Sequence, residues 1–209
     1  MRDAKAIILP SLRRPLFRPL ALPREIRIIG GRWRGRRLRF PAIADIRPTP
    51  DRVRETLFNW LGQDLTGLTT LDLFAGSGAL SLEALSRGAT RAVAVDRDRS
   101  TLQALSKTAM QLGTDALETH CSDAGAYLAR ETRLFDVIFL DPPFADPRWN
   151  TLVPAACERL ASAGALYLEA SSALDAPPGW VLSRSDKAGQ VHYHLLRRAE
   201  AGAPGGTPC

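Results

Sequence analysis

The chain has few cysteines, and its apolar runs are short. Its 209 residues include Cys121, Cys157 and Cys209, with no CxxC motif and no Cys/His spacing typical of a metal site. An odd number of cysteines without such spacing argues against a disulfide framework and against zinc. No apolar run approaches the roughly 20 residues of a membrane-spanning helix, and prolines interrupt the segment where a signal peptide would need an apolar core. We therefore expect a soluble, cytoplasmic protein with no metal and no membrane partner.

The chain also lacks a set of residues for nucleophilic catalysis. Its three histidines, His120, His192 and His194, are scattered and follow no Ser/His/Asp order. Such a set would need a base placed to activate the nucleophile. Structural roles for these histidines are the simpler interpretation.

Positive charge is concentrated in the first 60 residues. This segment holds fifteen Lys and Arg against five Asp and Glu, whereas residues 61–209 hold thirteen against seventeen, so the local net charges are +10 and −4. Fourteen of the fifteen cations are arginine, whose planar guanidinium suits phosphate oxygens and stacks on bases. Because clustered cations displace counterions from a polyanion, the asymmetry favours RNA or DNA as partner over a merely solvated arm.

Composition divides the chain into four parts. Residues 1–24 mix Pro, Arg and Leu without periodicity, and we expect a disordered basic arm there. Residues 25–62 should form a basic hairpin and a leading helix, and residues 63–198 the catalytic domain. The Ala/Gly/Pro-rich residues 199–209 should form a flexible tail.

Alternating apolar and polar residues around a glycine-rich turn predict an N-terminal β-hairpin. Strands at 25–29 and 36–40 flank the sequence Gly-Gly-Arg-Trp-Arg-Gly, which is typical of a hairpin with a basic tip. Asp51 is a plausible N-cap for the helix that follows, which Gly62 should stop. We expect RNA to contact Trp33 and the tip arginines, which are Arg32, Arg34, Arg36 and Arg37.

Strand and helix signals alternate from residue 68 onward. The expected strands are 69–73, 92–95, 117–121, 135–140, 165–169, 181–185 and 191–196, and the expected helices are 79–87, 99–112, 124–130 and 150–161. Repeated βα units of this length predict an α/β fold with a mostly parallel, Rossmann-like seven-stranded sheet covered on both faces. The last two strands have no helix between them, which predicts a closing hairpin.

A glycine-rich turn follows the strand that begins at residue 69. In residues 72–78, Asp-Leu-Phe-Ala-Gly-Ser-Gly, small side chains let the backbone pass close to a ligand where a strand turns into a helix. The turn lacks the third glycine of the dinucleotide fingerprint GxGxxG, and Asp72 would repel a pyrophosphate. A carboxylate at that position suits a cationic or hydroxyl-bearing ligand better.

Two later strands also end in acids. Asp96 comes twenty residues after Gly76, a position from which an acid accepts hydrogen bonds from ribose hydroxyls. Asp123 follows the next strand and could accept a bond from an adenine amino group. A ligand with adenine, ribose and a positively charged tail is S-adenosylmethionine. The candidate cofactor-binding residues are Asp72, Phe74, Ala75, Gly76, Ser77, Gly78, Asp96, Arg97, Asp123 and Ala124.

The sequence Asp141-Pro142-Pro143-Phe144 follows the apolar strand 135–140. The exocyclic amine of guanine or adenine is a poor nucleophile because its lone pair is delocalised into the ring. If the Asp141 carboxylate and the Pro142 carbonyl accept the two amine hydrogens, the nitrogen can turn its lone pair towards a methyl group. The prolines fix these acceptors in place, and Phe144 would stack on the base. These four residues are the candidate catalytic residues.

Several motifs together resemble one family. They are the hairpin run 27–36, the run Arg-Pro-Thr-Pro-Asp-Arg-Val-Arg-Glu-Thr-Leu-Phe-Asn-Trp-Leu at 47–61, residues 72–78, residues 141–144 and Ala-Gly-Gln-Val at 188–191. The set is similar to the RsmD family of bacterial 16S rRNA guanine-N2 methyltransferases. The similarity runs from about residue 25 to residue 198, and the arm and the tail lie outside it.

The resemblance implies a class I S-adenosylmethionine-dependent methyltransferase with a reversed final strand. It also implies a guanine of 16S rRNA, within the assembled or nearly assembled small ribosomal subunit, as methyl acceptor. Arg47 and Thr49 would cover the cofactor and approach the target base, and Arg52 lies in the same run as a further RNA-binding candidate. A monomer is the default expectation.

Two other functions remain open on the sequence alone. The sequence from Asp141 to Phe144, which we call the Asp141 ledge, would suit adenine-N6 methylation of RNA or DNA equally well. However, no separate target-recognition region is visible in the sequence. A non-catalytic ribosome-assembly factor could use the basic hairpin and retain an inactive pocket. The intact sequence at 141–144 speaks against that second alternative.

Overall fold

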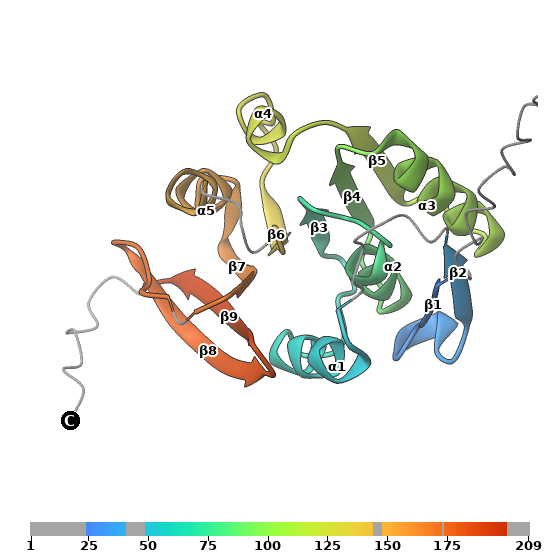
Figure 1. Cartoon of the computed structure of the whole chain (residues 1–209), viewed down its shortest axis with the longest axis horizontal. Coiled ribbons are helices and arrows are strands. Elements are labelled where there is room, and N and C mark those ends of the chain that lie inside the picture. Colours follow the sequence, from blue (N-terminus) through green and yellow to red (C-terminus); the bar gives the residue numbers. More distant parts are fainter. Residues whose placement is uncertain (1–23, 41–48, 144–147, 173, 200–209) are drawn as a thin grey trace, which may run out of the picture.

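A central sheet of seven strands organises the fold (Figure 1). The computed structural model describes residues 24–40, 49–143, 148–172 and 174–199. In these ranges the sheet consists of β3 (Thr69–Asp72), β4 (Arg91–Asp96), β5 (Leu117–Cys121), β6 (Phe135–Leu140), β7 (Leu160–Ala170), β8 (Trp180–Ala188) and β9 (Val191–Arg198). The spatial order is β5-β4-β3-β6-β7-β9-β8. The first five are parallel, and β9 is antiparallel to both β7 and β8, which confirms the mostly parallel sheet, the closing hairpin and the reversed final strand.

Helices cover both faces of the sheet, because its central strands are apolar on both sides. The helices are α1 (Asp51–Trp60), α2 (Ala79–Ser86), α3 (Arg99–Gln111), α4 (Ala124–Leu128) and α5 (Trp149–Cys157). In β4, Ala92 and Ala94 belong to one hydrophobic cluster with residues of α1, α2 and α3, whereas Val93 and Val95 belong to a second cluster with residues of α4 and α5. Alternate residues of a strand point to opposite faces, so the two clusters are the two sides of the sheet.

The N-terminal hairpin packs on the face of α2 and α3 (Figure 1). It consists of β1 (Arg24–Arg27), a 3₁₀ turn η1 (Gly31–Trp33) and β2 (Arg37–Phe40), and β1 and β2 are antiparallel. Gly31 has a φ of 71°, and a Cβ built on it would lie 1.8 Å from the Ser86 carbonyl oxygen. The close approach of η1 to the end of α2 therefore requires glycine at this position.

The structure corrects several element boundaries. Asp51 is the first residue of α1, and Pro50 occupies the N-cap position. The helix expected at 150–161 ends at Cys157, because β7 already begins at Leu160 beside Phe135. β8 continues to Ala188, so the turn before β9 is shorter than expected. Within the described ranges, no helix is long and apolar enough to cross a membrane.

Candidate active site

The glycine-rich loop and the Asp141 ledge meet at the carboxyl edge of the sheet. β3 lies between β4 and β6, and Asp72 pairs with Phe139 in register. The Leu73 amide donates to the Phe139 carbonyl at 3.1 Å, and the Ala75 amide donates to the Val95 carbonyl at 3.0 Å. The strand order reverses at β3: β4 and β5 lie on one side of it, and the connection after β5 returns to place β6 on the other side. Open α/β sheets bind ligands at such a reversal. The loop and ledge found in the sequence are thus neighbours in space.

Positive backbone φ angles shape the glycine-rich loop. Gly76 has a φ of 48° and Gly78 a φ of 74°, both in the left-handed region that glycine adopts without strain. The Gly78 amide donates to the Ala75 carbonyl at 2.7 Å, and Gly78 is the N-cap of α2. A Cβ on Gly78 would lie 2.2 Å from a Leu105 methyl carbon. Phe74 and Ser77 of the same loop are partly exposed, whereas Ala75 is buried.

Asp72 is a buried acid at the end of β3. Its Oδ2 accepts a hydrogen bond from the Ser81 hydroxyl at 2.8 Å. Burial raises the pKa of Asp72 to about 7 and nearby Asp96 adds to the rise, while the Ser81 hydroxyl and the Phe74 amide oppose it. A cation placed beside the carboxylate would favour its ionised form. The site is therefore chemically suited to a positively charged ligand.

Asp96 fastens the glycine-rich loop to β4. Its Oδ2 accepts from the Gly76 amide at 2.9 Å, and its Oδ1 accepts from the Asp98 amide at 2.8 Å. A carboxylate has about four acceptor positions, so these two bonds leave acceptor capacity. The Gly76 bond was not visible in the sequence, although the spacing of the two residues is that of the expected ribose-binding acid.

Asp123 and Arg97 contact each other rather than standing free. Asp123 caps α4 by accepting from the Ala126 amide at 3.1 Å, and its Oδ2 accepts from Arg97 Nε at 3.0 Å and from Arg148 Nη1 at 2.7 Å. Hydrogen bonding to Arg97 is the main cause that holds the pKa of Asp123 well below its usual range. Ala124, the first residue of α4, is buried. An adenine amino group would have to share the Asp123 carboxylate with two guanidinium groups, so this contact stays a prediction.

The ledge itself begins one residue after β6. Asp141 is half-buried, Pro142 is buried and Pro143 is exposed. Burial raises the pKa of Asp141 well above its ordinary value, and the neighbouring acids Glu169 and Asp72 raise it further. Like charges near one another disfavour ionisation, so the Asp141 carboxyl resists full ionisation beside these acids. Phe144 and Arg47, the other residues expected here, lie outside the described residues.

Two residues near the ledge were missed by the motif search. Glu169 is the second-last residue of β7, is 5% exposed, and accepts from the Tyr167 hydroxyl at 2.8 Å. Thr49, expected to approach the base, is buried, and its side chain lowers the pKa of Glu169, which burial raises. A polar residue at the end of an apolar strand was the signal that identified Asp72 and Asp141. The same signal would have identified Glu169.

The tip arginines are exposed, but Trp33 is not. Trp33 is 5% exposed, its amide donates to the Ser86 hydroxyl at 2.9 Å, and its ring belongs to the core cluster. Arg32 lies over the ring, 4.2 Å from its centroid. The expectation that Trp33 offers its ring to RNA is therefore corrected, because η1 turns the ring inward onto α2. Arg52 is exposed on α1.

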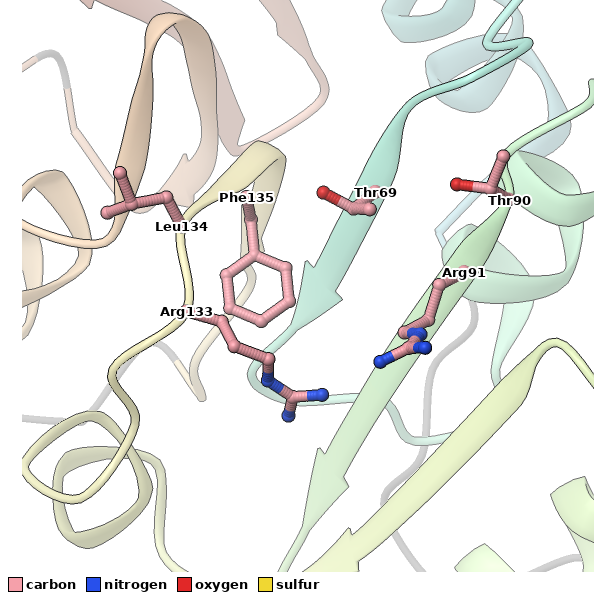
Figure 2. Close-up of a pocket in the computed structure, with 6 residues that line it drawn as sticks. All are labelled: Thr69, Thr90, Arg91, Arg133, Leu134 and Phe135. Atoms are coloured by element: carbon pink, nitrogen blue, oxygen red, sulfur yellow. The ribbon is translucent and has the colours of Figure 1, made fainter.

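A hollow in Figure 2 lies at the opposite edge of the sheet. It has a volume of about 440 Å³ and is lined by Thr69, Thr90, Arg91, Arg133, Leu134 and Phe135, where strands β3, β4 and β6 begin. Arg133 donates to Glu118 at 2.9 Å and to Glu131 at 2.6 Å. Its charge is thus neutralised within the chain. The functional groups gather instead at the carboxyl edge.

The sheet order, the glycine-rich loop and the acids at the strand ends define a class I, Rossmann-like methyltransferase fold. A family model described as "Conserved hypothetical protein 95" matches residues 26–197. The chain belongs to this family, the RsmD family.

Named relatives agree with this assignment. The chain is 40% identical over 183 residues to "Ribosomal RNA small subunit methyltransferase D" of Escherichia coli, covering 85% of this chain and 92% of the relative. The protein of the same name from Haemophilus influenzae is 36% identical over 188 residues, covering 83% and 94%. A solved Escherichia coli structure named as a methyltransferase superimposes with a TM-score of 0.76 at 41% identity, covering 83% of this chain and 98% of that chain.

Proposed function

We propose that the protein transfers a methyl group from S-adenosylmethionine to the exocyclic N2 of a guanine in 16S rRNA of the small ribosomal subunit. The observation that carries the proposal is the position of the Asp141 ledge beside the glycine-rich loop, joined through the pairing of β3 with β6. The printed names of the relatives supply the substrate class, small-subunit ribosomal RNA. An RNA of this kind is found in the cytoplasm, the compartment expected from the cysteine content.

The residues of the loop fit the proposed cofactor. Asp72 lies where a cationic tail would favour its ionised form, and Gly76 and Gly78 have the positive φ angles that shape the loop beside it. Asp96 retains acceptor capacity for ribose hydroxyls. S-adenosylmethionine would supply an electrophilic methyl group on a sulfonium centre. The acids also match the positive charge that such a ligand carries.

The ledge residues would prepare the nucleophile. The Asp141 carboxylate and the Pro142 carbonyl accept the two hydrogens of the base amine, and the nitrogen lone pair then points away from the ring plane. Asp141 must be ionised for this role, and both N–H donors and a nearby cation favour the ionised form. Because proline fixes the backbone, little reorganisation is needed during the reaction. The proton of the methylated amine can leave late, so Asp141 need not be a strong base.

The hairpin and α3 provide the proposed RNA-binding surface. A groove of about 630 Å³ lies between them and is lined by Glu25, Arg37, Leu38, Arg39, Ala104, Lys107, Thr108 and Gln111. Arg37, one of the tip arginines, lines it, and all four tip arginines are exposed. Cations spaced along a groove attract the phosphate backbone and release its counterions. We propose that rRNA crosses this surface while its target base reaches the ledge.

The decisive experiment supplies labelled methyl donor with small subunits, with naked rRNA and with DNA in separate reactions. We expect label in small subunits, and mass spectrometry of the nucleosides should identify N2-methylguanosine. N6-methyladenosine instead would replace the proposal with adenine methylation. No label in any reaction, together with tight subunit binding, would indicate a non-catalytic assembly factor.

A variant pair tests the role of the ledge. Asp141→Ala should abolish methyl transfer and leave subunit binding unchanged, because the carboxylate acts on the amine and not on the RNA backbone. Asp115→Ala is the matched control, since Asp115 is exposed at the other edge of the sheet, just before β5. Full activity in Asp141→Ala would remove the ledge from the mechanism.

A further inference from the structure

Three neighbouring strands end in acids at the same edge of the sheet. The acids are Asp72, the last residue of β3, Asp141, which directly follows β6, and Glu169, the second-last residue of β7. Leu140 pairs with Leu168, so Asp141 and Glu169 occupy corresponding positions on adjacent parallel strands. The proposed cofactor site gives Asp72 a role, and the proposed catalytic ledge gives Asp141 a role. Glu169 has no role in the mechanism described so far.

Glu169 faces the side of the sheet on which the segment before α1 lies. In β7, Tyr167 belongs to the cluster that includes α1, whereas Leu166 and Leu168 belong to the opposite cluster. Glu169 is two residues after Tyr167 and shares its face. The Tyr167 hydroxyl donates to Glu169 at 2.8 Å, and the side chain of Thr49, two residues before α1, is near enough to lower the pKa of Glu169. Glu169 therefore lies beside Asp141, on the face of the sheet that packs against α1.

Glu169 has more acceptor capacity than its protein partners use. Within the described residues, the bond from the Tyr167 hydroxyl takes one of the about four acceptor positions of a carboxylate. Within the described ranges, no lysine or arginine forms an ion pair with Glu169. The neighbouring carboxyl of Asp141 makes it less favourable for both acids to be ionised together. A buried acid in this setting is suited to a ligand that brings an N–H donor.

Guanine carries such a donor next to the amine that is methylated. When the ledge holds the two N2 hydrogens, the adjacent group on the same edge of guanine is N1–H. We propose that Glu169 accepts the N1–H of the target guanine and thereby selects guanine, an inference that rests on the proposed N2 methylation. Adenine and 2-aminopurine present an unprotonated N1 there, and its lone pair would face the carboxylate. A site with a buried polar group rejects a ligand that leaves the group unpaired.

The test uses 2-aminopurine, which keeps the N2 amine of guanine but has no hydrogen on N1. Small subunits are reconstituted with either base at the methylated position, once mass spectrometry has located it. We measure the ratio of kcat/KM for guanine to that for 2-aminopurine. In the Glu169→Gln variant this ratio should fall by roughly 10- to 100-fold relative to the unaltered protein, the range expected for a hydrogen bond to a charged group. The Gln amide can accept from N1–H or donate to a bare N1.

Two further variants separate base reading from structural support. Glu158→Gln makes the same chemical change at an exposed position of the α5 C-terminus and should leave the ratio unchanged. Glu169→Asp keeps a carboxylate and should lower the rate while retaining most of the guanine preference. Because each ratio is measured within one protein, a general loss of folded protein cancels.

The outcomes also separate this inference from the proposed function. N2-methylguanosine formation with an unchanged ratio in both Glu169→Gln and Glu169→Ala would overturn the role of Glu169 and leave the methylation proposal intact. Absence of N2-methylguanosine from the unaltered protein would overturn both. A ratio that falls in Glu169→Gln and is retained in Glu169→Asp would support Glu169 as the residue that reads N1.

Discussion

Replacing Glu83 should release the hairpin from the methyltransferase core. Glu83 lies on α2 and is fully buried. Its Oε1 accepts from the Gly30 amide at 2.7 Å and from Arg87 Nε at 2.9 Å. Its Oε2 accepts from the Ile29 amide at 2.9 Å and from Arg54 Nη1 at 3.3 Å. One carboxylate thus joins the hairpin, α1 and α2.

The expected cost follows from these four contacts. Glu83→Gln keeps the volume but removes the charge between Arg54 and Arg87, which are 1% and 9% exposed. Breaking a buried ion pair costs about 3–5 kcal/mol, because a charge is left uncompensated. Arg54 retains its bond to Asp51 at 2.6 Å, and Arg87 retains its position over Phe58, which favours the lower end of that range. We expect the free energy of unfolding to fall by about 3 kcal/mol, a large share of the roughly 5–15 kcal/mol typical of a domain.

Urea unfolding measures the expected loss in free energy of unfolding, and amide hydrogen exchange measures the release of the hairpin. The exchange of the Ile29 and Gly30 amides should accelerate more than that of β3 or β6, because glutamine offers one neutral carbonyl oxygen in place of the two carboxylate oxygens that accept from these amides. Glu55→Gln, on the exposed face of α1, should change the free energy of unfolding by less than about 0.5 kcal/mol. A loss below about 1 kcal/mol in Glu83→Gln, with both amides still protected, would refute the reasoning.

Three further predictions concern ligand binding and pH. Asp72 has a pKa of about 7 in the folded protein against an ordinary value of 3.8, so the unfolded chain loses this proton at lower pH and stability should fall as the pH rises from about 4 to about 7. Asp72→Asn should remove that fall and raise the free energy of unfolding at pH 8 by up to about 4 kcal/mol in urea titrations; an unchanged pH profile would contradict the assigned burial. Alanine at all four tip arginines should weaken rRNA binding and lower the slope of log affinity against log salt by roughly 2 to 4, and an unchanged slope would remove the hairpin from the RNA surface. Asp96→Ala should weaken S-adenosylmethionine binding by about 1–3 kcal/mol by calorimetry, whereas unaltered affinity would place the cofactor elsewhere.

The carboxyl-edge site could be predicted because it follows from periodicity alone. Apolar strands alternating with helices require a parallel sheet, and all parallel strands end at one edge. Asp72, Asp96 and Asp141 each come at the end of such a strand, so their closeness in space could be predicted without knowledge of side-chain contacts. The closing hairpin followed in the same way from the missing helix before β9.

Contacts between distant segments could not be predicted from local patterns. Trp33 has an arginine on either side, which is typical of a surface residue. In the structure its amide donates to the Ser86 hydroxyl of α2, and its ring is buried. Asp123 reads as a free strand-end acid, but Arg97 and Arg148 approach it from other turns. These outcomes depend on how the elements dock, and the spacing of residues along the chain does not encode that docking.

Glu83 and the acids of the carboxyl edge show how a structural acid differs from a ligand-binding one. Glu83 is compensated within the chain by Arg54 and Arg87. Asp72 and Glu169 are also buried and Asp141 is half-buried, yet the part of the chain that the structure describes gives none of them an ion pair. Uncompensated buried carboxylates lower stability and raise their own pKa, so their concentration at one edge has a cost that folding alone does not explain. A cationic cofactor and a base that donates N–H groups would remove that cost, which is why we assign both ligands to this edge.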